Sequence, residues 1–142
     1  MNKYVGFFLL GVGLAAILPP GSALAQTVLL RQEAGRTLEV SNVKVEDGTV
    51  TGELRNNSGN VVRDAQLLIR YTWLWKNEFH PGSDDPSRSV YYTVPGELAA
   101  HGTTRFQYAA TPPLPKRTDG SFTVSVGVAG FAEVFMPGKA AR

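Results

Sequence analysis

The sequence predicts an all-β fold in which two antiparallel sheets pack face to face, and three observations support this. Apolar residues alternate with polar residues in most segments of the chain, which is typical of strands with one buried face. Glycine, proline, asparagine and aspartate gather between these segments, where they favour turns. No segment carries an apolar stripe at helical spacing over three turns, so we expect helices to contribute little to the core.

The alternation is clearest in five segments, and we expect each of them to be a strand. In Ala65–Lys76, for example, the odd positions hold alanine, leucine, isoleucine, tyrosine and two tryptophans in turn. Weaker patterns at Thr27–Glu33 and Phe131–Met136 predict one further strand near each end of the chain. The five clear segments are Gly48–Arg55, Ala65–Lys76, Ser89–Val94, Thr104–Tyr108 and Ser121–Val128.

The segment Arg36–Glu46 also has an extended pattern, but its apolar phase slips between Val40 and Val43. A β-bulge or a change of sheet near Ser41-Asn42 would explain the slip. Glu46-Asp47-Gly48 then predicts a tight hairpin, because Asp-Gly tolerates the positive φ that such turns require. Seven or eight short strands in a chain of this length are typical of a two-sheet sandwich.

Residues 1–25 have the features of a secretory signal peptide, which leaves residues 26–142 as a single sandwich domain. Lys3 precedes the apolar run Val5–Leu18, and Ala23-Leu24-Ala25 offers the small residues that a signal peptidase needs. An uncleaved anchor is the alternative, but the run is shorter than the roughly 20 residues of a membrane span. We therefore expect cleavage after the tripeptide, a periplasmic or secreted product, and no stable membrane insertion afterwards.

The composition excludes several classes of protein. The chain has no cysteine, which excludes a disulfide framework, a thiolate metal site, a cysteine nucleophile and a lipid anchor on cysteine. Its formal net charge is +2, and Lys116-Arg117 is its one adjacent basic pair. Nucleic-acid binding needs a concentrated positive surface, so we do not expect it.

A strand and turn, Val50-Thr51-Gly52-Glu53-Leu54-Arg55-Asn56-Asn57-Ser58, precede the long segment Val61–Trp75, and Pro95-Gly96 and Phe106 follow. This order resembles the bacterial extracytoplasmic FxLYD-type immunoglobulin-like domains. The resemblance implies an immunoglobulin-like sandwich and a location in the cell envelope, and it implies no catalytic residues. The sequence departs from the family pattern at residues 71–76, which read Tyr-Thr-Trp-Leu-Trp-Lys and hold no aspartate.

The segment Asn77–Ser87 carries Glu78, His80, Asp84 and Asp85, which are candidate ligands for a divalent cation. They are also the candidate residues of a loop-based metal-dependent hydrolase. However, the aspartate spacing of a calcium loop is not found, and one histidine is few for zinc. No nucleophile with an adjacent base is evident either. We therefore expect a solvated loop, no cofactor and no enzymatic activity.

Six aromatic residues lie between Tyr71 and Tyr92, and they are the better functional lead. We expect Tyr71 and Trp73, in mid-strand, to belong to the core. The remaining residues predict a surface that anchors a partner through its rings, with charged residues at the rim. The candidate partner-binding residues are Trp75, Lys76, Phe79, His80, Asp84, Asp85, Arg88 and Tyr91.

The proline-rich segment Thr111–Arg117 has two interpretations. It is either a polyproline II ligand for another protein or a stiff connection between the sheets, and we favour the connection.

These features together predict a non-catalytic exported binding or structural module of the bacterial envelope. The expected partner is an envelope protein, and contact with carbohydrate or peptidoglycan through the same rings is the alternative.

Overall fold

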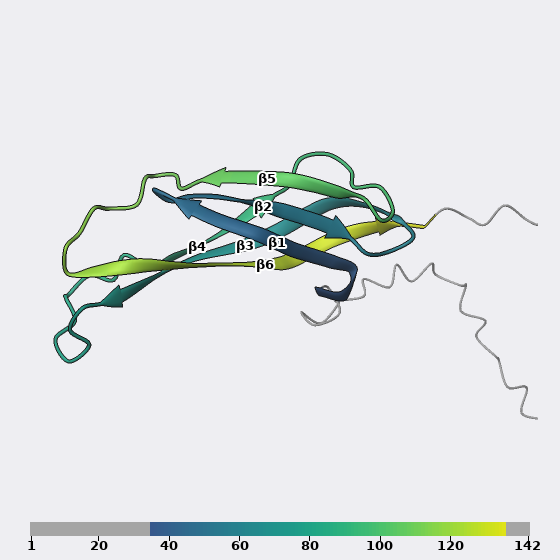
Figure 1. Cartoon of the computed structure of the whole chain (residues 1–142). Helices are drawn as coiled ribbons and strands as arrows, with labels where there is room; N and C mark the ends of the chain where they lie inside the picture. Colours follow the sequence, from purple (N-terminus) through teal and green to yellow (C-terminus); the bar gives the residue numbers. More distant parts are fainter. Residues whose placement is uncertain (1–34, 136–142) are drawn as a thin grey trace, which may run out of the picture.

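The structure, a computed structural model, describes residues 35–135, which form six strands in two antiparallel sheets (Figure 1). Sheet A has the order β1-β2-β5, and sheet B has the order β4-β3-β6. Within this part of the chain, no helix is long and apolar enough to span a bilayer. The strands are β1 (Leu38–Glu46), β2 (Thr49–Asn56), β3 (Val61–Trp75), β4 (Arg88–Thr93), β5 (Thr103–Ala109) and β6 (Gly120–Val134).

The predicted alternation is confirmed, and it places the core between the two sheets. Along β3, the odd positions from Ala65 to Trp73 are buried, whereas Arg70 and Thr72 between them are exposed. The same period of two recurs in β2, β4, β5 and most of β6 because successive side chains of a strand point to opposite faces. The buried cluster consists of Leu38, Val50, Leu54, Val62, Ala65, Leu67, Ile69, Tyr71, Val94, Leu98 and Phe106.

The bulge and the hairpin of β1 are also confirmed. The pairing register between β1 and β2 shifts between Ser41 and Lys44, and Asn42 adopts a φ of 52° there. In the hairpin, Asp47 and Gly48 have φ values of 46° and 80°, as the Asp-Gly pair predicts.

The predicted count of seven or eight strands is wrong for the described residues, which hold six. The expected strand Phe131–Met136 is not separate, since β6 continues without a break to Val134. It can do so because β3 extends back to Val61, which pairs with Val134 across a bulge between Arg63 and Gln66. The other expected strand, Thr27–Glu33, and the predicted signal peptide both lie outside the described residues.

Candidate functional site

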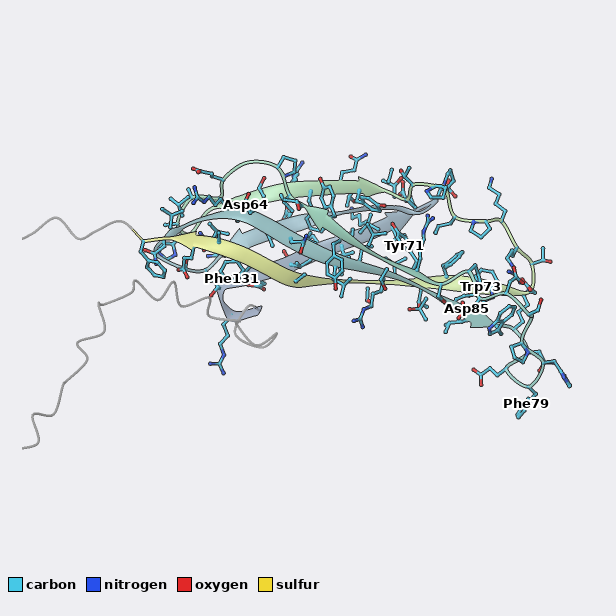
Figure 2. All side chains as sticks on the ribbon, turned by 180° about the vertical axis from the view of Figure 1, so that it is seen from behind. Asp64, Tyr71, Trp73, Phe79, Asp85 and Phe131 are labelled. Atoms are coloured by element: carbon cyan, nitrogen blue, oxygen red, sulfur yellow. The ribbon has the colours of Figure 1, made fainter. Side chains whose placement is uncertain are left out.

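The residues between β3 and β4, numbers 76–87, form a loop that projects from one end of the sandwich. Figure 2 shows Phe79 at its tip, with Trp73 and Asp85 nearer its base. The side chain of Phe79 is 90% exposed. Five of the eight predicted residues lie exposed on this β3–β4 loop, namely Lys76, Phe79, His80, Asp84 and Asp85.

Two tryptophans on the inner side of β3 form the base of the loop. Trp73 is buried, as predicted, and the edge of one indole meets the face of the other, with ring centroids 6.1 Å apart. Trp75 is half-buried, so the expectation of a freely exposed ring is wrong. The loop folds back on this ring, since a Cβ atom on Gly82 would lie 2.8 Å from Trp75.

Arg117, in the connection between β5 and β6, fastens the loop to the sandwich. Its guanidinium carbon lies 5.3 Å from the ring centroid of Trp73 and 5.1 Å from that of Trp75. The same group makes ion pairs with Asp84 at 2.9 Å and Asp119 at 2.5 Å. A planar cation with several fixed donors suits this combination of two rings and two carboxylates. We call Arg117, Asp84 and Asp119 the arginine clamp.

The clamp was not predicted from the sequence, in which Lys116-Arg117 stands out only as a basic pair. Asp84 is 33 residues away from Arg117, and both lie in segments without regular structure. No periodic pattern links two such loops, so only the tertiary fold brings them together.

Hydrogen bonds set the charge state of the acidic residues around the loop. The hydrogen bond from Arg117 holds the pKa of Asp119 below its ordinary value. Hydrogen bonds from Ser87 likewise lower the pKa of Asp85, whose Oδ1 accepts from the Ser87 backbone N–H at 2.8 Å. Both carboxylates therefore keep their charge to a lower pH than an ordinary aspartate does.

Acidification is expected to release the clamp and change the tryptophan fluorescence. Because the folded pKa of Asp119 is lowered, the ion pair is fully present above the ordinary aspartate pKa. It is lost as the pH falls through the lowered value. Emission of Trp73 and Trp75 should therefore shift in that window in the native protein. Arg117→Gln should show no such shift in emission. Far-ultraviolet dichroism at each pH excludes global unfolding as the cause. A shift of equal size in the variant would contradict the prediction.

Two predicted site residues lie elsewhere. Arg88 was expected at the rim, but it is half-buried, with its guanidinium 5.7 Å from the centroid of Tyr71. It donates a hydrogen bond to the carbonyl oxygen of Pro112, because its position in β4 faces the inside of the sandwich. Tyr91 is 64% exposed on the outer face of β4, opposite Leu68, and is not part of the loop.

The segment 111–117 lies between β5 of sheet A and β6 of sheet B, which confirms that it connects the sheets. Within this segment, the carbonyl oxygen of Pro112 accepts a hydrogen bond from the inward-facing Arg88, and Arg117 donates one to Asp84 of the β3–β4 loop. The connection is therefore also part of the site.

The four candidate metal ligands are not brought together. Asp84 pairs with Arg117, and Asp85 accepts from the backbone of Ser87. Across residues 35–135, no three histidine, aspartate or glutamate side chains converge on a point where they could hold a metal ion.

The site thus combines one exposed aromatic ring with a loop that is fixed at its base. Comparisons of the chain with protein-family models, with curated proteins and with solved structures found no match.

Proposed function

We propose that the protein is an exported, non-catalytic binding module of the bacterial envelope, with an immunoglobulin-like fold, that holds a protein partner through the β3–β4 loop. The observation that carries this proposal is the position of Phe79, 90% exposed at the tip of the loop. A large ring in that position gains most when a pocket of a partner covers it.

The fixed base of the loop supports the proposal. Binding costs less when the contact loop is already ordered, because less conformational entropy is lost. The arginine clamp and the packing of Gly82 on Trp75 both order the loop in this way. Exposed Lys76 and His80 near Phe79 supply the charged and polar rim that gives such a contact its specificity.

The contacts of the tryptophans favour a protein over a carbohydrate. A sugar stacks on a free, flat aromatic face, but Trp73 is buried and Arg117 lies over both indoles. The pairing of Asp84 with Arg117 and of Asp85 with Ser87 likewise favours binding over metal-dependent hydrolysis. The proposed envelope location depends on the leader features of residues 1–25 and on the resemblance to FxLYD-type domains.

A matched pair of phenylalanine substitutions tests the proposal. Phe79→Ser should reduce recovery of the envelope partner about tenfold or more. Truncation of a ring at the centre of an interface weakens the binding free energy by about 2 kcal/mol. Phe135 is 70% exposed and follows β6, whose end lies farthest from the loop, so Phe135→Ser should leave recovery unchanged. Crosslinking in the native host identifies the partner. Equal recovery with both variants would contradict the assignment, and Tyr91→Ser shows whether the outer face of β4 also contributes.

A further inference from the structure

Strand β6 presents an unusual sheet edge. One of its edges pairs with β3, and no strand among the described residues pairs with the other. From Gly120 to Ala132 the strand contains no charged residue and no proline. An exposed edge of this kind is a template for another strand, because its N–H and C=O groups lack partners.

The other three edge strands carry features that oppose edge pairing. The strand β4 is six residues long, and β5 is seven residues long and presents the exposed Arg105. The strand β1 has a bulge and carries exposed Lys44 and Glu46. Short length, charge and bulges are the features that natural sheets use against unwanted pairing, and β6 has none of them within Ser121–Ser125.

Among residues 35–135, the part of this edge that no other segment passes is its first third. Gly35 lines a groove with Leu68 and with residues 125–128 on the outer face of sheet B. Leu38, three residues later, is buried between the sheets. The chain entering β1 must therefore pass around the edge of β6 near this groove, so Ser121–Ser125 is the stretch that a second strand can reach.

An apolar seam lies beside the same stretch. Val43 and Val45 of β1 are 40% and 41% exposed. The hydroxyl of Tyr71 donates to the carbonyl oxygen of Gly48 at 2.8 Å, and Tyr71 pairs with Val124. The end of β1 therefore lies level with Val124. The inward-facing side chains of β6 at this point, Phe122 and Val124, are only half-buried.

We propose that β6 pairs with β6 of a second copy of this chain, antiparallel and centred on Thr123. This register places Ser121 opposite Ser125 and Phe122 opposite Val124, so polar residues meet on the outer face and apolar residues on the inner face. The two sheets B join into one sheet of six strands, and the exposed valines of both copies gather beside the two-fold axis. This contact is independent of the β3–β4 loop and its partner.

Charge substitutions at the two-fold axis test this dimer by sedimentation over a concentration series. The native protein should show a monomer–dimer equilibrium. Thr123→Lys and Thr123→Glu should each weaken the dimer at least about fivefold, since like charges then face each other. An equimolar mixture of the two variants should restore a heterodimer, which a folding defect cannot do. Thr72→Lys is the matched control, because Thr72 is exposed beside Thr123 on the central strand β3.

Three results would overturn the dimer. The first is a native protein that is monomeric throughout the series. The second is a mixture of the Lys and Glu variants that stays monomeric while both variants are folded by circular dichroism. The third is a monomer that dimerises only when the residues before Gly35 are removed, which would mean that the chain itself covers the edge.

Discussion

Replacing Asn56 by aspartate is expected to lower the free energy of unfolding by about 3–5 kcal/mol, a large part of the total for a domain of this size. Asn56 is fully buried, and it is the one polar side chain among the described residues with that degree of burial in the core. The substitution replaces the side-chain NH₂ group of this residue by an oxygen at a position that water cannot reach.

The contacts of Asn56 explain the expected loss. Its amide nitrogen lies 2.7 Å from the carbonyl oxygen of Asn60, 3.1 Å from that of Ala99 and 3.3 Å from that of Leu98. Its side-chain oxygen accepts from the backbone N–H of Ser58 at 3.0 Å and from the Ser58 hydroxyl at 2.7 Å. The side chain thus joins the turn after β2 to the segment that leads into β5. A carboxylate would lose the three N–H donations and place a charged oxygen against three carbonyl oxygens in a site without water.

Urea unfolding of Asn56→Asp and Asn57→Asp measures this difference. Asn57 is exposed, so its substitution should cost less than about 1 kcal/mol. The buried site should also raise the pKa of the introduced carboxyl above its unfolded value. The loss in Asn56→Asp is then largest at neutral pH and becomes smaller as the pH falls through the carboxyl range. Equal stability of the two variants at pH 7 would contradict the assigned role of Asn56.

Those parts of the fold that depend on neighbouring residues were predictable from the sequence. The period of two along β3 defined its buried face, and the Asp47-Gly48 pair defined the hairpin, because both are local effects of side-chain direction and φ. The phase slip in β1 correctly predicted a bulge near Ser41-Asn42. In the site, the core positions of Tyr71 and Trp73 followed from the same alternation, and the exposure of Phe79 followed from its place in the loop after the strand.

The errors concern contacts between distant segments. The half-burial of Trp75 depends on Gly82 and Arg117, and the inward position of Arg88 depends on Pro112. Within residues 35–135 the strand count was wrong because β6 continues past its own alternating pattern, alongside the longer strand β3. Loop-to-loop pairing and strand extension are decided by tertiary contacts, and alternation within one strand carries no information about them.

Replacing Gly52 by valine is the second substitution for which we expect a large effect, a loss of about 3 kcal/mol in the free energy of unfolding. Gly52 of β2 is buried and pairs with Phe106 of β5, whose ring lies across it. A Cβ atom at position 52 would lie 2.6 Å from Cζ and 2.8 Å from Cε1 of this ring. Phe106 is 3% exposed, so the ring has little room to move without disturbing the core.

Thermal and urea unfolding of a double-mutant cycle tests this packing. Phe106→Leu alone should lower the free energy of unfolding by about 1–2 kcal/mol. In the Gly52→Val background, however, the smaller leucine should recover about 1 kcal/mol or more of the stability that valine removes. Gly127→Val is the matched control, because no atom of residues 35–135 lies within 4 Å of a Cβ atom at that position, and its stability should stay close to the native value. Additive losses in the cycle would show that Gly52 is required for a reason other than the Phe106 ring. A non-additive cycle would instead show that Gly52, in the strand pattern Val50-x-Gly52-x-Leu54, is required for packing of the sandwich. It is not a feature of the site, since it lies between buried residues of sheet A.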